Sequence, residues 1–524
     1  MTGADQPAAR PASSLARDSA LVGAATMVSR LLGFARDVLI ARLLGGGPVA
    51  DAYLAALRLP NLVRRVLGEG GLNAPFVPLY LAIARERGLG EARRFAAQAT
   101  GHLAVFLLLL VALGEMAAPW LVLALAGGFA QEPQTLAYAA LYTQLMLPFL
   151  LLTTLASLLA ALLNAERRFA IAALAPALMN AVLLALLIGL HLFGTAPQAS
   201  ARWLAIGVSV TGLAHLVMIL LALRGLGLPW PPLGWSPDMT RLLKTGGATL
   251  LAASAAQLVL LVATQIASIE PGAVSALYYA DRVFQLPLGF VGVAMGTVVL
   301  SEMAEAAREG GPDAMLGRSL ALGLALALPA ATALVVLADP IVSVLFEHGR
   351  FGAEDRERTA AALAAFGGGL PFAVAAKVFG QVYFARRQSR LPLVSGGLAL
   401  LVAVLAGLAL ARPDNAAPMA ALAATLAFAA QAVWLGAMLI RDGIWRPGGG
   451  NLRPVAASLV ASALMAGALI LLLRLMAVPL ALDQPGWHRL GALGLICAGG
   501  FAAYAGFAWL LGALEALPLR KRRG

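Results

Sequence analysis

Apolar stretches of 18 or more residues recur along this sequence from near residue 95 to near residue 514. Each stretch is long enough to cross a hydrocarbon layer of about 30 Å as an α-helix. The chain of 524 residues is 60% hydrophobic and 12% charged, whereas a soluble domain is about 25% charged. In lipid, every backbone N–H group needs a partner within the chain, and we see none of the short alternating strands that a barrel requires. The sequence therefore predicts an all-α polytopic membrane protein.

We expect about fourteen transmembrane helices, separated by loops that contain Gly and Pro breakers. The first two helices are polar enough that a hydropathy window would miss them. The expected ranges are 20–44, 49–82, 95–125, 135–163, 169–192, 202–224, 240–267, 272–304, 317–338, 357–385, 392–411, 416–440, 454–477 and 488–514.

Lys and Arg residues are concentrated in alternate loops, which independently supports fourteen spans. Short cytoplasmic loops carry an excess of these residues, so both termini are expected to be cytoplasmic. Most of the formal net charge of +12 then lies at one membrane face, which argues against nucleic acid as a partner. The basic residues of the even-numbered loops are Arg85, Arg87, Arg93, Arg94, Arg167, Arg168, Arg224, Arg241, Lys244, Arg308, Arg318, Arg386, Arg387, Arg390, Arg441, Arg446 and Arg453.

The domain organisation follows from this helix count. We predict a cytoplasmic N-terminal tail at 1–19, an N-lobe of six helices at 20–230 and a C-lobe of six helices at 231–445. Two further helices at 446–514 and a basic cytoplasmic tail at 515–524 complete the chain. Repeated halves are a common way to build a transporter with its site at their interface.

Ionisable residues within the predicted spans are the most informative ones. A charge at the bilayer centre costs about 2.5–3.5 kcal/mol on insertion scales. These side chains must therefore face a protein interior or a water-filled cavity. The basic ones are Arg30, Arg36, Arg58, Arg64, Arg65, Arg282 and Lys377, and the acidic ones are Asp37, Asp51, Glu69 and Asp281.

Helical spacing places several of these residues on shared faces. In the second expected helix Asp51, Arg58 and Arg65 are seven residues apart, Glu69 follows, and Asn61 and Arg64 form a neighbouring stripe. In the eighth, one face holds Ser275, Tyr278, Arg282 and Gln285. Proline kinks a helix, and Pro60 and Pro287 lie near these groups. Kinked helices at a polar centre suit a cavity that opens and closes.

Two interpretations of these charges remain open. Adjacent pairs such as Arg36 with Asp37, Asp281 with Arg282, and Arg65 with Glu69 would serve as buried ion pairs that hold helices together. Seven basic groups against four acidic ones leave a positive surplus, however, which favours an anionic ligand. The planar guanidinium fork of arginine suits phosphate.

Several motifs resemble the MurJ (MviN) lipid II flippase family of the MOP exporter superfamily. The longest is the block from Ser29 to Asp37, followed by Ala50 to Tyr53, Leu59 to Arg65, Glu69-Gly70 and Ala74 to Pro78. The others, in chain order, are Asn164 to Phe169, Pro176 to Asn180, Tyr278 to Arg282, Leu286 to Gly289 and Leu345 to Phe351.

This resemblance implies two six-helix lobes in a V around a central cavity, with the last two helices forming a groove for a lipid tail. It implies an alternating-access flippase that moves lipid II, an undecaprenyl-pyrophosphate-linked disaccharide-pentapeptide, across the bacterial inner membrane during peptidoglycan biosynthesis. Membrane lipids and the cell-wall synthesis machinery are the partners that it suggests. Gln285 replaces an acid found in some members, which puts a cation-coupling role at this position in doubt.

By motif position, Arg36, Arg64 and Arg282 match the cavity arginines that hold the pyrophosphate. As further substrate-binding candidates we take Arg30, Arg58, Asn61, Ser275 and Lys377. As structural or gating candidates we take Asp37, Asp51, Glu69, Asp281, Pro60 and Pro287.

Other function classes fit less well. The five histidines are scattered, so no metal site or cofactor is expected, and no phosphate-cradling glycine loop is present. An enzyme is therefore not expected. A cation-drug exporter of the same superfamily should carry surplus acid. A flippase for another undecaprenyl-pyrophosphate-linked oligosaccharide stays an alternative, because it would bind the same anion.

Overall fold

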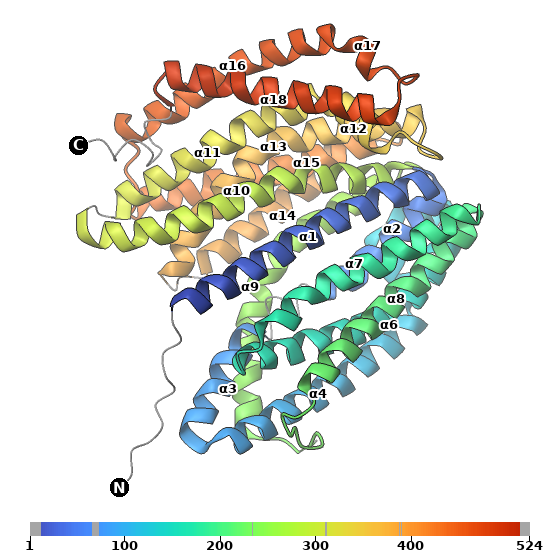
Figure 1. Cartoon of the computed structure of the whole chain (residues 1–524), viewed down its shortest axis with the longest axis vertical. Helices are drawn as coiled ribbons and strands as arrows, with labels where there is room; N and C mark the ends of the chain where they lie inside the picture. Colours follow the sequence, from blue (N-terminus) through green and yellow to red (C-terminus); the bar gives the residue numbers. More distant parts are fainter. Residues whose placement is uncertain are drawn as a thin grey trace. The chain divides into compact units, whose positions relative to one another are not determined.

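The computed structural model of the chain describes residues 12–64, 73–232, 234–309, 312–386, 388 and 390–513. Helices make up all the secondary structure in these ranges, as the sequence predicts (Figure 1). Several helices begin at a proline, which has a φ suited to a first turn and lacks an N–H group that would have no partner there.

The first half of the chain forms nine α-helices and one short 3-10 helix within the described residues. Their bounds are α1 Ala12–Leu44, α2 Pro48–Arg64, α3 Asn73–Arg87, α4 Leu89–Met116, α5 Ala118–Leu125, η2 Gly127–Gln131, α6 Pro133–Ala165, α7 Phe169–Leu192, α8 Pro197–Leu223 and α9 Pro237–Ala267.

The second half continues with nine more α-helices within the described residues. Their bounds are α10 Ala273–Glu309, α11 Pro312–Val336, α12 Ala338–Phe346, α13 Ala353–Ala385, α14 Arg390–Leu410, α15 Ala416–Arg441, α16 Gly449–Leu475, α17 Ala477–Leu480 and α18 Gly486–Leu510.

One expected helix is divided in two close to a proline, and short helices that were not expected, α12 and α17, follow α11 and α16. The expected helix 95–125 is α4 and α5, and the division falls two residues before Pro119. Proline cannot donate to the carbonyl four residues earlier, and the carbonyl of Glu115 instead accepts the amide of Gln144 at 3.0 Å. Pro340 and Pro479 follow the corresponding breaks between α11 and α12 and between α16 and α17.

The expected helix 49–82 corresponds to α2 and α3. Helix is described up to Arg64 and again from Asn73. Arg65 and Glu69 lie outside the described residues, so their expected pairing stays a prediction.

Ten helices in the described part of the chain are long and apolar enough to cross a membrane. They are α4, α6, α7, α8, α11, α13, α14, α15, α16 and α18. Helices α1, α2 and α10 do not meet this criterion, and they are the helices that carry most of the predicted site residues. Because charges are costly in lipid, we expect the charged faces of these helices to point away from it.

The chain divides into two compact units, which we describe separately. Unit 1 comprises residues 1–40, 56–118 and 140–253, and unit 2 comprises residues 41–55, 119–139 and 254–524.

Unit 1 is built around a core supplied by α3, α4, α6, α8 and the start of α9. Phe76 and Tyr80 of α3 stack in line with Phe95 of α4. Leu162 and Ile219 bring α6 and α8 into the same cluster. Helices α7 and α8 pack on each other, at Gly207, where a Cβ atom would lie 2.5 Å from a methyl of Leu186.

Unit 2 is organised around α13, which packs on α10, α11, α12 and α15. Small residues allow the closest of these contacts. A Cβ atom at Gly369 would lie 2.5 Å from the hydroxyl of Thr425 on α15, and one at Gly367 would lie 2.9 Å from Leu334 on α11. Helices α16 and α18 lie side by side, and α11 also contacts α16 (Figure 1).

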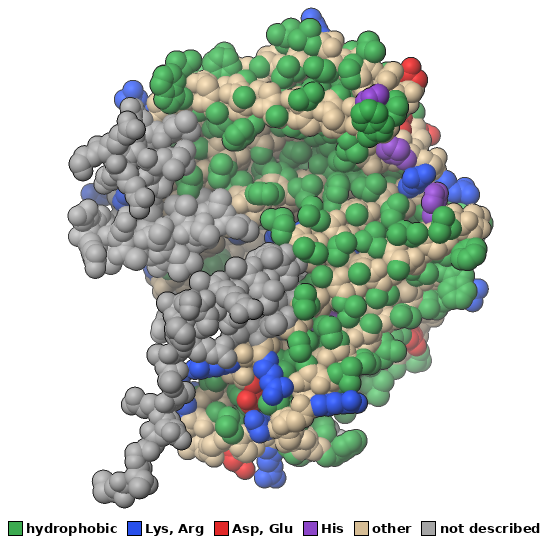
Figure 2. Space-filling view, viewed as in Figure 1, with side chains coloured by type: hydrophobic (Ala, Val, Ile, Leu, Met, Phe, Trp, Pro, Cys, Tyr) green, Lys and Arg blue, Asp and Glu red, His purple; other side chains and the backbone are tan. Residues whose placement is uncertain are grey.

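Large apolar side chains remain exposed on the outward faces of many helices. Figure 2 shows hydrophobic side chains spread over the visible helices rather than gathered in one patch. Examples are Phe106 and Leu109 of α4, Val433 of α15 and Phe501 of α18. Such a surface is compatible with a hydrocarbon environment and not with water.

Candidate functional site

In unit 1, Arg36 of α1 is held by a buried carboxylate and an amide. Its Nε and Nη2 atoms donate to Oδ1 of Asp37 at 3.0 and 2.7 Å, and Asp37 is only 2% exposed. Its Nη1 donates to Oδ1 of Asn180 on α7 at 3.0 Å. The expected pair of Arg36 and Asp37 is therefore present, and the contacts fix the orientation of the guanidinium.

Asn180 also fastens α7 to α1. Its Nδ2 donates to the carbonyl of Ser29 at 2.9 Å. The two helices approach closely here because Gly33 has no side chain: a Cβ at this position would lie 3.3 Å from Nδ2 of Asn180. Arg30, one residue beyond Ser29, is exposed and is not part of this cluster.

Helix α2 contributes three half-buried polar residues to unit 1. Arg58, Asn61 and Arg64 follow one another at intervals of three residues and therefore share one side of the helix. Arg64 is close enough to His215 of α8 for electrostatic interaction. Pro60 lies buried inside α2, as expected.

In unit 2, Arg282 of α10 lies against an aromatic ring one turn earlier. Its Nη2 donates to the hydroxyl of Tyr278 at 2.9 Å, and its guanidinium carbon lies 4.6 Å from the ring centroid. Gln285 donates to Oδ2 of Asp281 at 2.5 Å. Gln285 thus orients a buried carboxylate next to Arg282.

Lys377 of α13 lies next to a later part of α10. Its Nζ lies 2.9 Å from where a Cβ atom of Gly292 would be, and its side chain is exposed. Gly292 is ten residues after Arg282, which is roughly 80° away around an α-helix, and Pro287 lies inside α10 between them. The two predicted basic residues of unit 2 therefore do not share one face of α10.

Asp51, at the first turn of α2, caps the start of α10. Its Oδ2 accepts the N–H of Gly272 at 2.6 Å and its Oδ1 accepts the N–H of Ser275 at 2.7 Å. The first N–H groups of a helix have no partner within it and carry partial positive charge, so a carboxylate is a favourable cap. Ser275 is fully buried in this contact, and its hydroxyl donates to the carbonyl of Gly272 at 2.9 Å.

Glycine is needed on both sides of this contact. Gly272 has φ +82°, and a Cβ atom there would lie 2.4 Å from the carbonyl oxygen of Gly46. Gly45 has φ +74° in the turn between α1 and α2, where a Cβ atom would lie 2.8 Å from the carbonyl oxygen of Arg350. L-residues rarely adopt such φ values.

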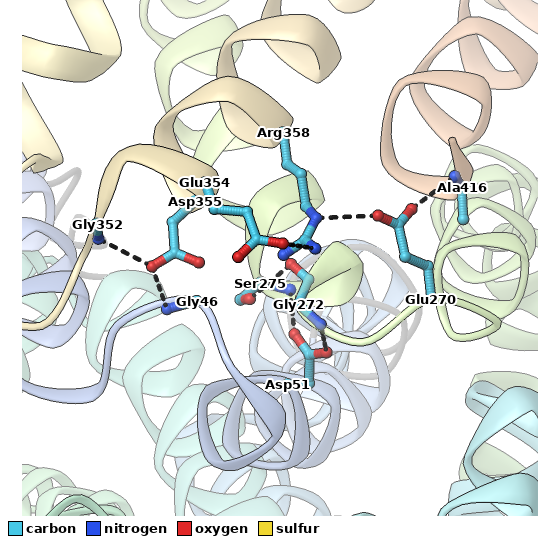
Figure 3. A network of polar contacts seen from close by, with 10 residues as sticks. All are labelled: Gly46, Asp51, Glu270, Gly272, Ser275, Gly352, Glu354, Asp355, Arg358 and Ala416. Carbon is cyan, nitrogen blue, oxygen red and sulfur yellow. Dashed lines mark hydrogen bonds and ion pairs between the residues drawn. The ribbon is translucent and has the colours of Figure 1, made fainter. Parts of the chain in front are cut away.

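Further loop contacts surround this cap (Figure 3). Asp355 of α13 accepts the N–H groups of Gly46 at 3.2 Å and Gly352 at 3.0 Å. Glu270 is buried, binds Arg358 at 2.9 Å and accepts the N–H of Ala416 at 2.8 Å. We call these residues the loop network: Gly46, Asp51, Glu270, Gly272, Ser275, Gly352, Glu354, Asp355, Arg358 and Ala416.

Most of the loop network was missed by sequence reasoning, which singled out only Asp51 and Ser275. Asp355 lies at a helix start and Glu270 in a loop, where acidic residues are common, so their residue types did not indicate a functional contact. Asn180 could have been recognised, because an amide within an apolar helix needs a polar partner.

The described residues contain no group of three or more His, Cys, Asp or Glu side chains able to hold a metal ion. The site offers guanidinium and ammonium groups, which can bind anions, and carboxylates that orient them or cap a helix.

Comparisons with known proteins agree with the motifs. The family model described as MurJ, lipid II flippase MurJ, matches residues 40–482. A protein of Rhizobium meliloti (strain 1021), described as a probable lipid II flippase MurJ, is 37% identical over 516 residues, which cover 97% of this chain and 96% of that protein.

Solved structures share the fold. A structure described as lipid II flippase MurJ in an inward closed conformation superposes with a TM-score of 0.77 at 23% identity, covering 94% of this chain and 98% of that chain. A multidrug resistance MATE family transporter of the MOP superfamily, in an inward-facing conformation, gives a TM-score of 0.60 at 16% identity over 79% of this chain and 95% of that chain.

Proposed function

This chain belongs to the MurJ family of lipid II flippases, and we propose that it carries lipid II from the cytoplasmic to the periplasmic leaflet of a bacterial inner membrane by alternating access. The sugar-peptide head of such a substrate cannot cross hydrocarbon, whereas its tail prefers to stay there. The protein must therefore give the head a polar route without removing the tail from lipid.

The observation that carries this proposal is the placement of basic side chains on helices of the interior. Arg36, Arg64 and Arg282 lie on α1, α2 and α10 and are only partly exposed, although the surrounding protein is apolar. The planar fork of a guanidinium group can bind two phosphate oxygens at once. We infer that these arginines bind the pyrophosphate, with Arg58, Asn61 and Lys377 as supporting contacts.

The proposed orientation rests on basic loops that meet at one end of unit 1. The loop after α3, the loop after α6 and the segment between α8 and α9 contact one another there, and an excess of Lys and Arg marks a cytoplasmic face. These contacts are Arg87 with Asp238 at 2.6 Å, Arg93 with Glu166 at 3.4 Å and Arg168 with the carbonyl of Ala222 at 2.9 Å.

The loop network then lies on the periplasmic side, because its loops alternate along the chain with those basic loops. It joins the turn between α1 and α2, the start of α10 and the start of α13. We propose that it closes the periplasmic exit in this conformation, and that release of the head requires these contacts to break. Asp51 and Asp355 are gating residues in this scheme.

The test is flipping of fluorescent lipid II in liposomes that contain the purified full chain, read by an impermeant quencher. We expect Arg36→Ala and Arg282→Ala each to lower the rate at least about tenfold, since a hydrogen bond to a charged group contributes about 1.5–3 kcal/mol. Arg474→Ala, at the exposed end of α16, is the matched control and should be unchanged.

Full activity in both variants would overturn the pyrophosphate role of the arginines. A parent chain that flips a different undecaprenyl-pyrophosphate-linked oligosaccharide, but not lipid II, would overturn the substrate assignment. Depletion in the host provides the cellular counterpart: lipid II should become inaccessible to a probe added outside.

A further inference from the structure

Arg489, in the first turn of α18, is a buried cation in unit 2. It is 3% exposed, and its Nη2 donates to the hydroxyl oxygen of Ser343 on α12 at 2.7 Å. Its Nε donates to the carbonyl of Leu480 at 3.3 Å. Both acceptors are neutral, so the charge of this guanidinium must be balanced one step further away.

Ser343 links Arg489 to that balancing charge. A serine hydroxyl has one hydrogen to donate and lone pairs with which to accept. Here the hydrogen goes to Oε2 of Glu347, so the lone pairs face Arg489. Glu347 also binds Arg356 of α13 at 3.5 Å. The serine therefore aligns its dipole between a buried cation and a carboxylate.

Arg356 carries this chain of contacts to the start of α13. Its Nε lies 3.2 Å from Oδ1 of Asp339, and its backbone N–H donates to the carbonyl of Gly352 at 3.0 Å. It follows Asp355 directly and precedes Arg358 by two residues, and both belong to the loop network.

The loop between α12 and α13 makes a second connection. The N–H of Arg350 donates to the carbonyl of Arg42 at the end of α1, at 3.0 Å. Gly349 has φ +65°, and a Cβ atom there would lie 2.6 Å from the same carbonyl. The loop 347–352 thus contacts the end of α1 through Gly349 and Arg350, and it is connected to Arg489 through Glu347 and Ser343.

We propose that Arg489 is a positioning residue for gating: it couples the C-terminal helices α16 and α18 to closure of the loop network. The inference rests on the proposed gating role of that network. When the loop 347–352 moves, Glu347 leaves Ser343, and the buried charge of Arg489 loses its balance. The coupling also acts in the other direction. A displacement of α18 withdraws the Arg489 donor, so Ser343 and Glu347 are no longer held in place and the loop is released.

The experiment measures how often the gate opens, independently of any substrate. Cys497 is replaced by alanine to remove the native thiol, and the buried Ser275 is replaced by cysteine in every variant. A membrane-impermeant thiol reagent is then added to intact cells, and the labelling rate is compared for Arg489→Gln, Arg489→Lys, Ser343→Ala and the Arg474→Gln control.

We expect Arg489→Gln to be labelled about three to ten times faster than the parent, and Ser343→Ala about two to four times faster. Arg489→Lys, which keeps the charge, should fall between the parent and Arg489→Gln. Arg474→Gln should match the parent. If Arg489→Gln fails to fold, Ser343→Ala carries the test, because it removes one oxygen and keeps the arginine.

An unchanged labelling rate in both Arg489→Gln and Ser343→Ala would overturn the coupling. So would lower thermal stability without faster labelling, because that pattern is expected of a residue that only fastens α18. A chain of the native sequence that does not flip lipid II would refute the proposed function, while the labelling comparison would still decide the coupling.

Discussion

Asp37 and Asp51 are two buried carboxylates on neighbouring helices, but they bind different kinds of donor. Asp37 in unit 1 accepts two N–H groups of one guanidinium, whereas Asp51 in unit 2 accepts two backbone N–H groups at the start of α10. The first arrangement fixes the orientation and charge of one side chain. The second joins two segments of backbone and can be broken only when these segments separate. In the proposed function, Asp37 is therefore a structural residue that orients Arg36, and Asp51 is a gating residue.

The largest expected effect is that of Asp51→Asn. The amide keeps one acceptor oxygen, but its NH₂ group would face the second backbone N–H and repel it. We expect the protein to lose about 2–4 kcal/mol of stability, as for a broken buried charged hydrogen bond. Thermal unfolding in detergent should show a clearly lower midpoint, and Asp483→Asn in an exposed loop is the control.

The opposite result would be an unchanged unfolding midpoint in Asp51→Asn and a much lower midpoint in Asp37→Asn. Asp37, not Asp51, would then be the carboxylate that holds the structure together.

The next effect concerns the charge beside Arg36. In Asp37→Asn the amide oxygen still accepts from the guanidinium, but the negative charge that opposes an anionic ligand is gone. We expect binding of lipid II to tighten on the order of tenfold, because a unit charge about 7 Å away contributes about 2 kcal/mol at an effective dielectric constant of about 20. Flipping should slow, since release becomes harder.

Equilibrium binding of lipid II to the purified chain measures this effect, with Asp483→Asn as the charge-matched control. Weaker binding in Asp37→Asn would indicate that this carboxylate serves mainly to orient Arg36. The negative charge of Asp37 would then not oppose the anionic ligand.

A smaller effect is expected at Gln285, whose amide donates to Asp281. In Gln285→Glu this hydrogen bond is replaced by repulsion between two carboxylates next to Arg282. We expect lipid II binding to weaken several-fold, because the added negative charge opposes an anionic ligand. Gln484→Glu in a loop of unit 2 is the control, and unchanged binding in Gln285→Glu would contradict this account.

The helical fold could be predicted from the sequence because each apolar run carries its own signal. The charged helices α1, α2 and α10 were predicted from motif and spacing, although hydropathy alone does not detect them. The division of the expected helix 95–125 near Pro119 was missed, although a proline within a predicted helix is a visible warning. The short helices α12 and α17, which contain Pro340 and Pro479 beyond the ends of the expected helices, were missed as well.

The candidate site was predictable only where a side chain carries the chemistry. The pair of Arg36 and Asp37 is adjacent in sequence and was anticipated. The contact between Gly46 and Asp355 joins residues 309 positions apart, and that between Asp51 and Gly272 joins residues 221 apart. Backbone N–H groups are the donors in both, and every residue except proline has one, so no residue type marked them.

The smallest expected effect is a dependence of stability on pH that comes from unit 2. His348 lies in the loop between α12 and α13, and burial, followed by the nearby cations Arg489 and Arg42, lowers the pKa of its imidazole, with Glu347 opposing. An unfolded histidine titrates near pH 6.5, so below this pH the unfolded chain binds a proton before the folded chain does. Stability should therefore be fully present above about pH 6.5 and fall as the pH drops below it.

The comparison is the melting midpoint at several pH values between about 7.5 and 5.5 for the parent and for His348→Gln, which cannot take up this proton. We expect a shallower decline in the variant. Because the imidazole is only partly buried, water screens its neighbours and the slope should be modest. If the melting midpoint fell with pH equally steeply in both proteins, protonation of His348 would not be the cause. The pH sensitivity would then not be located in the loop between α12 and α13.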